Sequence, residues 1–573
     1  LERVVAFPRN IEVEATMTGQ ESENGGPGGP PGRGGDGPET VTKLMHWSMV
    51  LLPDEPMSPR LHDKRVGFIS SEYVDYGRPE HRAEERRFIH RFELVPSDME
   101  AFRNGELVEP VEPIVYWIDP ATPEWLQPWV ETGVEAWNEA FREAGFENAI
   151  DARVAPTEEE DPEFSLYDAR HSVVYWRPST VANATGGQVV DPRSGEILKG
   201  EVNMYHNVME LLRNWYFTQV SPLDERARNL PLPDSLMGRL VEYVVTHEIG
   251  HSIGFPHNMK ASAMYPADSI RSESFLRRMG GHVATLMDYS RFNYVAQPED
   301  DIPPELLIPK IGPYDKFAVR WGYRPIPDAE TPDEERPTLN EWASVQDTVP
   351  WLRFSVRDAT ADPENLTEAV GDDDPVQSSA LGLENLERVM DSLIRVAERP
   401  GEDYELLETL YDNAVNQWGR YMGHVTALVG GQISRQRYGT GPRFEPVSRE
   451  RQEEAMDFLA ERAFETPEML IDREILRRIE PEGAIPRIRR AQSRILGALL
   501  AESVLIRLVE YEALDPGEAY RITDLMADLR EAIWSELEDG DVQIDVYRRN
   551  LQRAHLEVIE ERLTPPEEEE NGG

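Results

Sequence analysis

The chain contains no cysteine among its 573 residues. This absence excludes structural disulfides, thiolate ligands for a metal ion and any latency mechanism that uses a cysteine. It does not determine the compartment in which the protein works. A metal site in this chain would have to be built from histidine nitrogens and carboxylate oxygens.

Lysine is scarce, and acidic residues outnumber basic residues as a whole. Lysine and arginine together number 59 against 107 aspartates and glutamates, which gives a formal net charge of −48. Such a surface repels nucleic acids and anionic membranes, so we expect neither to be a partner. The lysines are Lys43, Lys64, Lys199, Lys260, Lys310 and Lys316.

Long apolar runs are missing too. The longest apolar stretch, residues 495–509, is interrupted by Glu502 and Arg507, which predicts a core helix and no insertion into a membrane. The hydrophobic fraction is 39%. A chain of this length can bury several globular cores, so we expect more than one domain.

One eleven-residue segment, residues 247–257, carries the clearest chemical signal and reads His-Glu-x-x-His-x-x-Gly-x-x-His. On a helix, His247 and His251 leave the same face about one turn apart, so both rings can reach one zinc ion at roughly 2.0–2.1 Å. Glu248 points about a quarter turn away, where it can hold a water without ligating the metal. A bare His-Glu-x-x-His occurs by chance in many helices, and the added glycine and third histidine favour zinc.

Gly254 and His257 complete the predicted zinc site. Glycine tolerates the left-handed backbone that ends a helix and reverses the chain, which brings His257 round as a third ligand. Three protein ligands leave the fourth position open, which is typical of one catalytic zinc ion. We predict that the nearby His282 is a surface residue, since three ligands are already present.

A second signal lies about thirty residues further on, in the run Thr-Leu-Met-Asp-Tyr at 285–289. It resembles the Met-turn of the metzincin metalloproteases, a tight turn that places a methionine beneath the zinc. That resemblance assigns Met287 to the turn and Tyr289 to a position beside the metal. The alternatives are a core methionine and a core tyrosine with a satisfied hydroxyl.

Three further segments, residues 257–262, 287–298 and 312–316, resemble bacterial zinc-dependent metalloproteases with an EcxA-type zinc-binding domain. The resemblance extends over the chain and is densest between residues 113 and 325. It implies a large exported protein, extracellular or periplasmic, with a β-rich module before a metzincin domain and a helical region after it. The chain departs from that pattern in starting at Leu1, without a methionine, a signal peptide or the full upstream module.

These observations predict an α+β protein. A partial β-rich module over residues 1–107 precedes a metzincin-like catalytic domain over 108–325, which has a mixed sheet and a zinc-binding helix. A mostly helical region follows over 326–564, and the composition of residues 565–573 predicts a disordered tail. Residues 25–38 are nearly all glycine and proline, which predicts a flexible insertion in a hairpin.

Hydrophobic periodicity predicts individual elements. In the first module we expect residues 9–17 to pair with 41–52, and further strands at 66–69 and 87–92. In the catalytic domain, the expected order is strand, amphipathic helix, strand, hairpin, zinc helix and final helix, over residues 113–118, 122–145, 172–176, 188–203, 234–253 and 314–322.

Two details of the catalytic domain are specific enough to check. The helix over 122–145 is expected to bury Trp125 on its apolar side. The zinc helix is expected to use Asp234 as its N-cap.

The last part of the chain is predicted to be helical over residues 381–398, 403–428, 448–464, 486–512 and 516–537. A proline-rich, acidic segment over 325–337 is the expected boundary before it. Residues 359–374 are strongly acidic and are expected to be a solvated loop. Calcium is a second candidate ion there, without further support.

The combined interpretation is a zinc-dependent endopeptidase, in which Glu248 is the general base and Tyr289 stabilises the oxyanion. A protein or peptide substrate is expected to pair along an exposed edge strand that contains Gly187, Val189 and Val190, unless a neighbouring module covers that hairpin. Two alternatives stay open: a zinc hydrolase restricted to short peptides, and a non-enzymatic surface binding protein that keeps a metal. The sequence leaves the oligomeric state undetermined.

Overall fold

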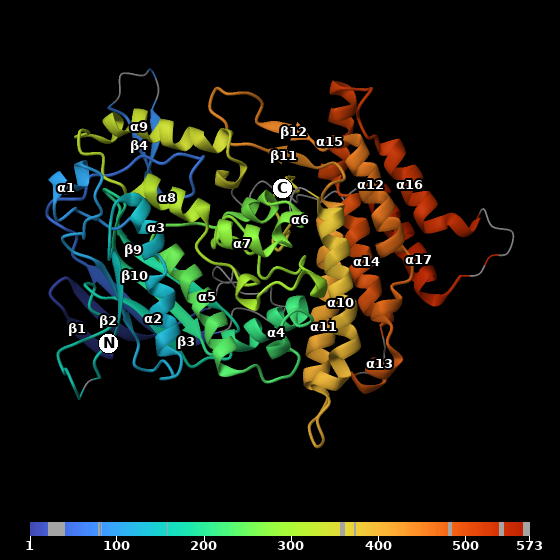
Figure 1. The fold of residues 1–573 in the computed structure, drawn as a ribbon, viewed down its shortest axis with the longest axis horizontal. Helices are drawn as coiled ribbons and strands as arrows, with labels where there is room; N and C mark the ends of the chain where they lie inside the picture. Colours follow the sequence, from blue (N-terminus) through green and yellow to red (C-terminus); the bar gives the residue numbers. More distant parts are fainter. Residues whose placement is uncertain are drawn as a thin grey trace.

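The computed structural model describes most of the chain and shows both helices and strands in an α+β arrangement. The described residues are 1–20, 40–77, 81, 83–157, 159–355, 361–371, 374–479, 484–537, 542 and 544–564. The glycine- and proline-rich insertion 25–38 and the tail 565–573 lie outside them. In Figure 1, the mixed region with its sheets lies on the left and a helical region lies on the right.

A five-stranded mixed sheet forms the frame of the region over residues 108–325, in the order β7-β6-β8-β10-β9. Its inner strands are parallel, and β9 is an antiparallel edge strand. The bounds are β6 Ile114–Ile118, β7 Ile150–Val154, β8 Ser172–Arg177, β9 Ala184–Asp191 and β10 Glu196–Tyr205. The buried strands could be predicted from the sequence, because parallel strands that are covered on both faces form continuous apolar runs. The predicted hairpin is confirmed.

The predicted helix over residues 122–145 is wrong in its extent. The chain forms α2 Gln127–Glu135 and α3 Asn138–Phe141, with a short 3-10 turn ending at Gly145 in a left-handed conformation. The break falls at Trp137, whose indole Nε1 donates to the carbonyl of Thr246 over 2.8 Å. Trp125 precedes α2 and is 41% exposed, so it does not belong to the buried face.

The N-terminal strands agree in part with the prediction. Strands β1 Arg3–Ala6, β2 Asn10–Gln20 and β3 Thr40–Val50 form an antiparallel sheet in which β2 pairs with β3 as expected. The prediction of a strand over 66–69 is wrong. That segment runs into the core of the region over residues 108–325, where Phe68 packs against Phe255 and Trp321. Strand pairing begins after it, between β4 Ser70–Asp75 and β5 Glu84–Ile89.

The helices from α10 Pro375–Ala397 onward lie together on the right of Figure 1, whereas α9 Pro332–Ser344 lies on the left, beside the mixed region. Most predicted helices are present, but the one over 486–512 is two helices, because the chain turns at Leu500 and lets Arg507 reach the carbonyl of Gly430 over 2.6 Å. The predicted boundary 325–337 contains the start of a helix, α9. The bounds are α9 Pro332–Ser344, α10 Pro375–Ala397, α11 Glu405–Thr426, α12 Arg449–Leu459, α13 Arg473–Ile479, α14 Ile485–Leu499, α15 Glu502–Leu514, α16 Ile522–Trp534 and α17 Val546–Leu563.

The described part of the acidic segment 359–374 is buried, which overturns the expectation of a solvated loop. Asp362 and Glu364 are 1% and 3% exposed. Both accept hydrogen bonds from the ammonium of Lys260, at 2.8 and 2.7 Å, and Glu364 also pairs with Arg435. The carboxylates are buried because two basic residues neutralise them.

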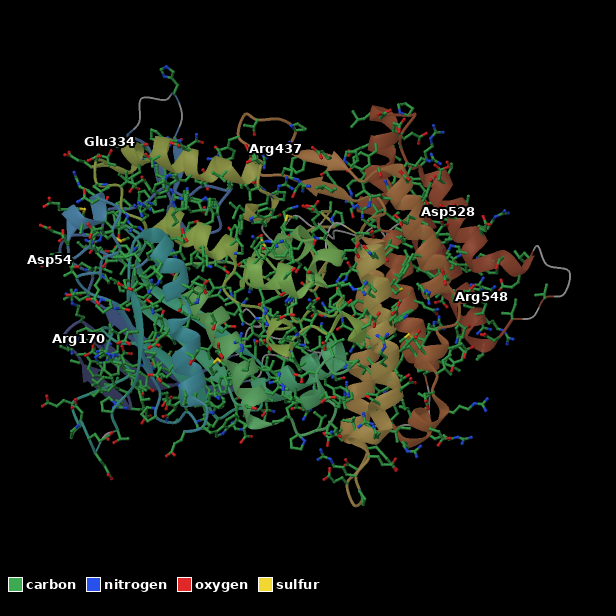
Figure 2. All side chains as sticks on the ribbon, viewed as in Figure 1. Asp54, Arg170, Glu334, Arg437, Asp528 and Arg548 are labelled. Carbon is green, nitrogen blue, oxygen red and sulfur yellow. The ribbon has the colours of Figure 1, made fainter. Side chains whose placement is uncertain are left out.

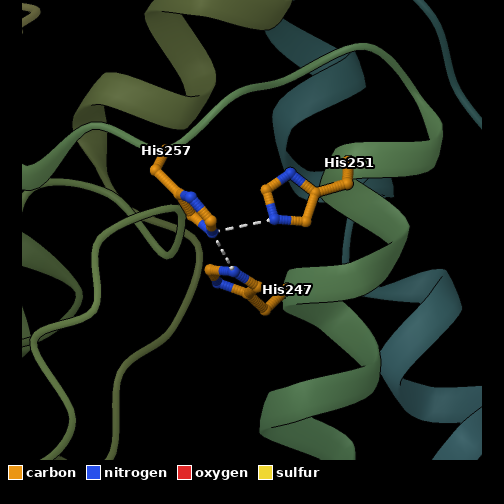
Figure 3. Close-up of side chains that lie close together, drawn as sticks. All are labelled: His247, His251 and His257. Carbon is orange, nitrogen blue, oxygen red and sulfur yellow. Dashed lines mark hydrogen bonds between the residues drawn. The ribbon is translucent and has the colours of Figure 1, made fainter. Parts of the chain in front are cut away.

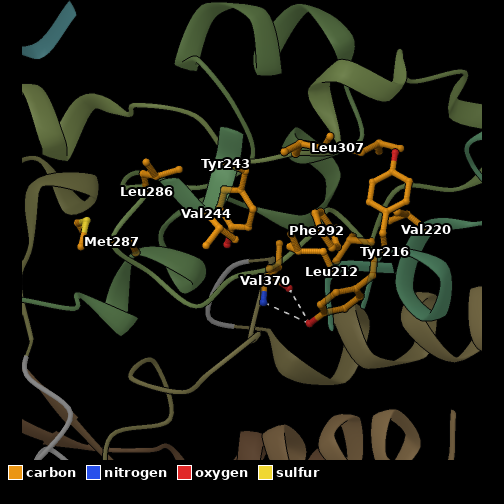
Figure 4. Close-up of a cluster of buried hydrophobic side chains, with 14 of the residues drawn as sticks. Leu212, Tyr216, Val220, Tyr243, Val244, Leu286, Met287, Phe292, Leu307 and Val370 are labelled. Carbon is orange, nitrogen blue, oxygen red and sulfur yellow. Dashed lines mark hydrogen bonds between the residues drawn. The ribbon is translucent and has the colours of Figure 1, made fainter. Parts of the chain in front are cut away.

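Hydrophobic packing joins the two regions. A buried cluster takes side chains from α4 Val208–Val220, from α5 Asp234–Ser252, from the segment after α5 and from Val370 (Figure 4). The labelled side chains in Figure 2 mark both ends of the molecule, with Asp54 and Arg170 at one end and Asp528 and Arg548 at the other. Among the described helices, none is both long and apolar enough to cross a membrane.

Candidate metal centre and active site

Helix α5 carries the first half of the site. It spans Asp234–Ser252, so Asp234 is its first residue, and Pro233 takes the N-cap position that was predicted for Asp234. Gly254 follows the helix with φ +111°. A Cβ built on Gly254 would lie 2.2 Å from the carbonyl oxygen of His90, so both the backbone conformation and the space require glycine. The chain then reverses toward His257.

Three histidines converge after this reversal (Figure 3). The Nε2 atom of His257 lies 3.2 Å from Nε2 of His247 and 3.0 Å from Nε2 of His251. The three candidate ligand atoms all lie within 4.8 Å of one another. Sequence spacing had predicted this convergence of residues from the helix and from the following loop.

The protons of two rings are held away from the centre. Nδ1 of His247 lies 2.8 Å from the carbonyl oxygen of Leu286, and Nδ1 of His251 lies 2.7 Å from that of Phe255. A carbonyl oxygen can only accept, so each Nδ1 carries the hydrogen and each neutral ring turns its Nε2 lone pair toward the centre. Second-shell carbonyls of this kind commonly orient metal-ligating histidines.

At neutral pH, His247 and His251 do not bind a proton at these lone pairs. Burial, followed by the charges of His251 and His257, holds the pKa of His247 well below its ordinary value. Burial also lowers the pKa of His251. Neutral imidazole nitrogens facing one another at about hydrogen-bond distance fit a zinc ion, which accepts three such ligands and keeps a fourth position open.

Met287 lies directly against the zinc helix. It is 1% exposed, and its sulfur would be 2.2 Å from a Cβ added to Gly250. The carbonyl of Met287 accepts from the amide of Asn258 over 3.0 Å, next to His257. Asp315 stabilises the turn at Met287, because its carboxylate accepts a hydrogen bond from the amide of Leu286 over 2.9 Å.

Tyr289 lies beside the histidines. Its ring centroid is 4.1 Å from that of His257 and 5.5 Å from that of His247. The guanidinium carbon of Arg291 lies 4.6 Å from the tyrosine ring centroid. The carbonyl of Tyr289 accepts from the amide of Glu368 over 2.9 Å. The tyrosine therefore contacts two candidate ligands, Arg291 and the backbone of Glu368.

Glu248 is 8% exposed, and burial raises the pKa of its carboxyl to about 7. Its carboxylate accepts a hydrogen bond from the backbone amide of Gly186 in β9, which acts in the opposite direction. A carboxyl with a pKa near neutrality can both accept and release a proton at physiological pH.

Strand β9 runs alongside the zinc helix. A Cβ on Gly186 would lie 2.2 Å from the carbonyl oxygen of Glu248, and the side-chain amide of Gln188 donates to the carbonyl of His251 over 3.1 Å. The predicted substrate-strand residues Gly187, Val189 and Val190 are half-buried on this edge strand. The structure thus places them next to the helix that carries the histidines.

Sequence reasoning missed the charged residues behind the turn. Arg291 has φ +59° and stacks 3.6 Å from the ring centroid of Trp215, and its Nε lies 3.7 Å from Glu368. Glu368 is 3% exposed, with φ +63°. The only sign of Glu368 in the sequence was the acidic segment 359–374, which was predicted to be a solvated loop. His282 is a second correction: it is fully buried, and burial lowers its pKa to about 3.

Comparisons with known families agree with this geometry. Residues 229–541, more than half of the chain, match a family model described as Met-zincin. Residues 1–97 match a domain of unknown function, DUF5117. Curated proteins and solved structures give no match. The Met-zincin match contains all three converging histidines, the helix that carries two of them and the turn at Met287. On this evidence, the chain belongs to the Met-zincin family.

Proposed function

We propose that the protein is a zinc-dependent endopeptidase that hydrolyses peptide bonds in protein or peptide substrates. Membership in the Met-zincin family, together with the histidine cluster, suggests a zinc metallopeptidase. The observation that supports the endopeptidase most is the position of Glu248, a buried carboxyl on the same helix as His247 and His251, with its pKa raised to about 7. A site that only binds metal has no use for such a group.

His247, His251 and His257 would hold the zinc through their Nε2 atoms. When bound, zinc polarises the scissile carbonyl and makes a water more acidic. The carboxylate of Glu248 accepts a proton from the attacking water and then delivers it to the leaving amine. Tyr289 donates a hydrogen bond to the oxygen on which negative charge develops. Arg291 and the histidine rings keep the tyrosine ring in place.

Strand β9 supports the choice of a polypeptide substrate. An extended peptide can add to an edge strand through main-chain hydrogen bonds, which gives affinity with little sequence preference. Gly186 brings this edge against the zinc helix at Glu248. We propose that Gly187, Val189 and Val190 line the bound peptide. An EcxA-type zinc-binding domain and an extracellular or periplasmic location are part of the same proposal, and they follow from the sequence resemblance.

A casein or gelatin cleavage assay tests the function directly. The purified chain should cleave the protein substrate, lose activity with a zinc chelator and regain it when zinc is added back. An enzyme restricted to short peptides would cleave only a short fluorogenic peptide in the same assay. A zinc-loaded, folded chain that cleaves neither would support the non-enzymatic binding protein.

A further inference from the structure

A groove of about 1060 Å³ lies between α11 and α14, in the helical region beyond the zinc site. Helix α15 and the segment 361–367 contribute to its lining. It runs along α14 from Arg487 to Ala498, which corresponds to about 16 Å at 1.5 Å per residue. That length accommodates roughly five residues of an extended chain.

Arginines dominate the charge of this groove, which we call the arginine groove. Among the described lining residues, one acid, Asp412, stands against five arginines. The arginines are Arg420, Arg487, Arg490, Arg494 and Arg507. In a chain with a net charge of −48, the groove is a positive strip in a negative field, so it selects anionic ligands.

Three of the five arginines form no ion pair with an acidic residue that the structure describes, and one of these, Arg507, donates to the carbonyl of Gly430 over 2.6 Å. Arg487 pairs with Asp412 at 2.7 Å, and Arg420 lies 3.3 Å from Glu368. Arg490 and Arg494, one turn apart on α14, are exposed and form no ion pair with any residue that the structure describes. Their guanidinium groups are available for carboxylates of another molecule, with the bidentate geometry that arginine offers.

The floor of the groove is bare backbone. Gly419 and Gly423 lie one turn apart within α11, and a Cβ added to either would meet nothing within 4 Å. Glycine inside a helix costs about 1 kcal/mol relative to alanine, and no neighbouring atom of this chain requires it here. Two glycines at these positions let a bound chain approach the helix closely.

The polar groups of the groove suit a polypeptide. His424 donates from Nε2 to the carbonyl of Thr367 over 2.9 Å, which leaves Nδ1 as a buried acceptor without a partner among the described residues. Such an acceptor fits a peptide N–H. Asn413 and Asn416 add carboxamides to the lining. No phenylalanine, tyrosine or tryptophan is among the described lining residues, so single-stranded nucleic acid would find no stacking platform.

One short segment borders both the groove and the zinc site. Leu366 and Thr367 line the groove, and the amide of the next residue, Glu368, donates to the carbonyl of Tyr289 over 2.9 Å. From this geometry we propose that the arginine groove is an exosite that binds an acidic stretch of the polypeptide substrate. The inference rests on the proposed peptidase function for the identity of the ligand as substrate.

Binding can be tested without catalysis. The probe is a fluorescein-labelled peptide of four Glu-Ala repeats, and the protein is the full chain carrying Glu248→Gln, followed by fluorescence anisotropy. Arg490→Glu with Arg494→Glu should weaken binding by about tenfold or more, and added salt should weaken it in the parent. Gly423→Leu fills the floor without a change of charge and should also weaken binding, at an unchanged melting temperature.

A matched control is present on α17. Arg549 and Arg553 are exposed, have the same spacing and form no ion pair with any residue in the described ranges. Their double change to glutamate alters the net charge equally and should change affinity by less than about twofold. Equal weakening by both double variants would overturn the proposal, because only net charge would then matter. So would a twelve-nucleotide single-stranded DNA that binds as tightly as the peptide and depends on the same arginines.

Two more measurements separate the sources of failure. In the chain that keeps Glu248, Arg490→Glu with Arg494→Glu should raise KM at constant kcat for a substrate with an acidic stretch. The same double change should leave KM unaltered for a matched substrate in which glutamines replace the acidic residues. If the chain cleaves both substrates and the double change alters neither KM, the exosite proposal is overturned. If the acidic peptide binds but no substrate is cleaved, only the proposed function is overturned. Changing Glu567, Glu568, Glu569 and Glu570 to glutamine should leave affinity unchanged. A gain of about tenfold would identify the chain's own tail as the occupant, against the proposal.

Discussion

The sulfur of Met287 occupies the space in which a side chain on Gly250 would begin. A Cβ at that glycine would lie 2.2 Å from the sulfur and 2.7 Å from the Trp137 ring. Gly250 directly precedes His251, so the turn and the zinc helix interlock at the level of the ligands. The buried methionine therefore packs directly against the helix backbone. The two segments can come this close because residue 250 has no side chain.

Gly250→Ala should destabilise the protein and disturb the metal site. Overpacking of a core typically costs about 1–3 kcal/mol, and here the displaced atoms belong to Met287 and Trp137. We expect a lower melting temperature and weaker zinc retention. Gly497→Ala in α14 is the control, because its Cβ meets nothing within 4 Å, and it should stabilise by about 0.5–1 kcal/mol. A Gly250→Ala protein that is as stable as the control would contradict the interlock.

His257→Ala should lower zinc content and activity together. Two imidazoles hold zinc far less tightly than three, and the remaining pair would face an open coordination position. Metal analysis of the parent should give about one zinc per chain. His206→Ala removes an exposed histidine outside the cluster and should change neither quantity. Parent protein that is folded, never chelated and free of zinc would refute the assignment of the ligands.

The sequence predicted those parts of the site that lie close together along the chain. Spacing on one helix placed His247 and His251, and the turn composition of residues 191–196 placed the hairpin of β9 and β10. It did not place Arg291 or Glu368, because burial of a charge depends on partners that are remote in sequence. Glu368 pairs with Arg420 of α11 at 3.3 Å and contacts Tyr289 through the backbone.

The helix breaks were also hidden from local periodicity. The predicted helix over 486–512 has no proline or glycine at the break between α14 and α15, and α15 is held in its own direction by the hydrogen bond from Arg507 to the carbonyl of Gly430. Tertiary contacts of this kind override local propensity. His282 was also misplaced: it is fully buried, and the residue types around it in the sequence do not show this.

Glu248→Gln should separate catalysis from metal binding. Glutamine keeps an oxygen that can accept from the amide of Gly186, but it cannot take a proton from water. A general base typically contributes 10²–10⁴ in rate, so kcat/KM should fall by about that factor at unchanged zinc content and melting temperature. Turnover within about tenfold of the parent would show that Glu248 is not the base.

Tyr289→Phe should lower kcat more than it raises KM. The hydroxyl's hydrogen bond forms mainly in the transition state, and removing one such donor costs about 10²–10³ in kcat in well-studied enzymes. The ring would keep its place between His257 and Arg291, so zinc content should be unchanged. An unchanged kcat with a lower melting temperature would instead identify a structural tyrosine.

Proline substitution at Val189 or Val190 tests how the substrate is held. Each proline removes one backbone donor, and successive amides of a strand point in opposite directions. One of the two amides faces β10, and its loss should lower the melting temperature, since a ladder hydrogen bond breaks. The other faces away from the sheet, and its loss should raise KM for a peptide substrate at unchanged zinc content. If neither variant alters peptide cleavage, substrate does not pair with β9, and a cleft wall other than this edge must position the scissile bond.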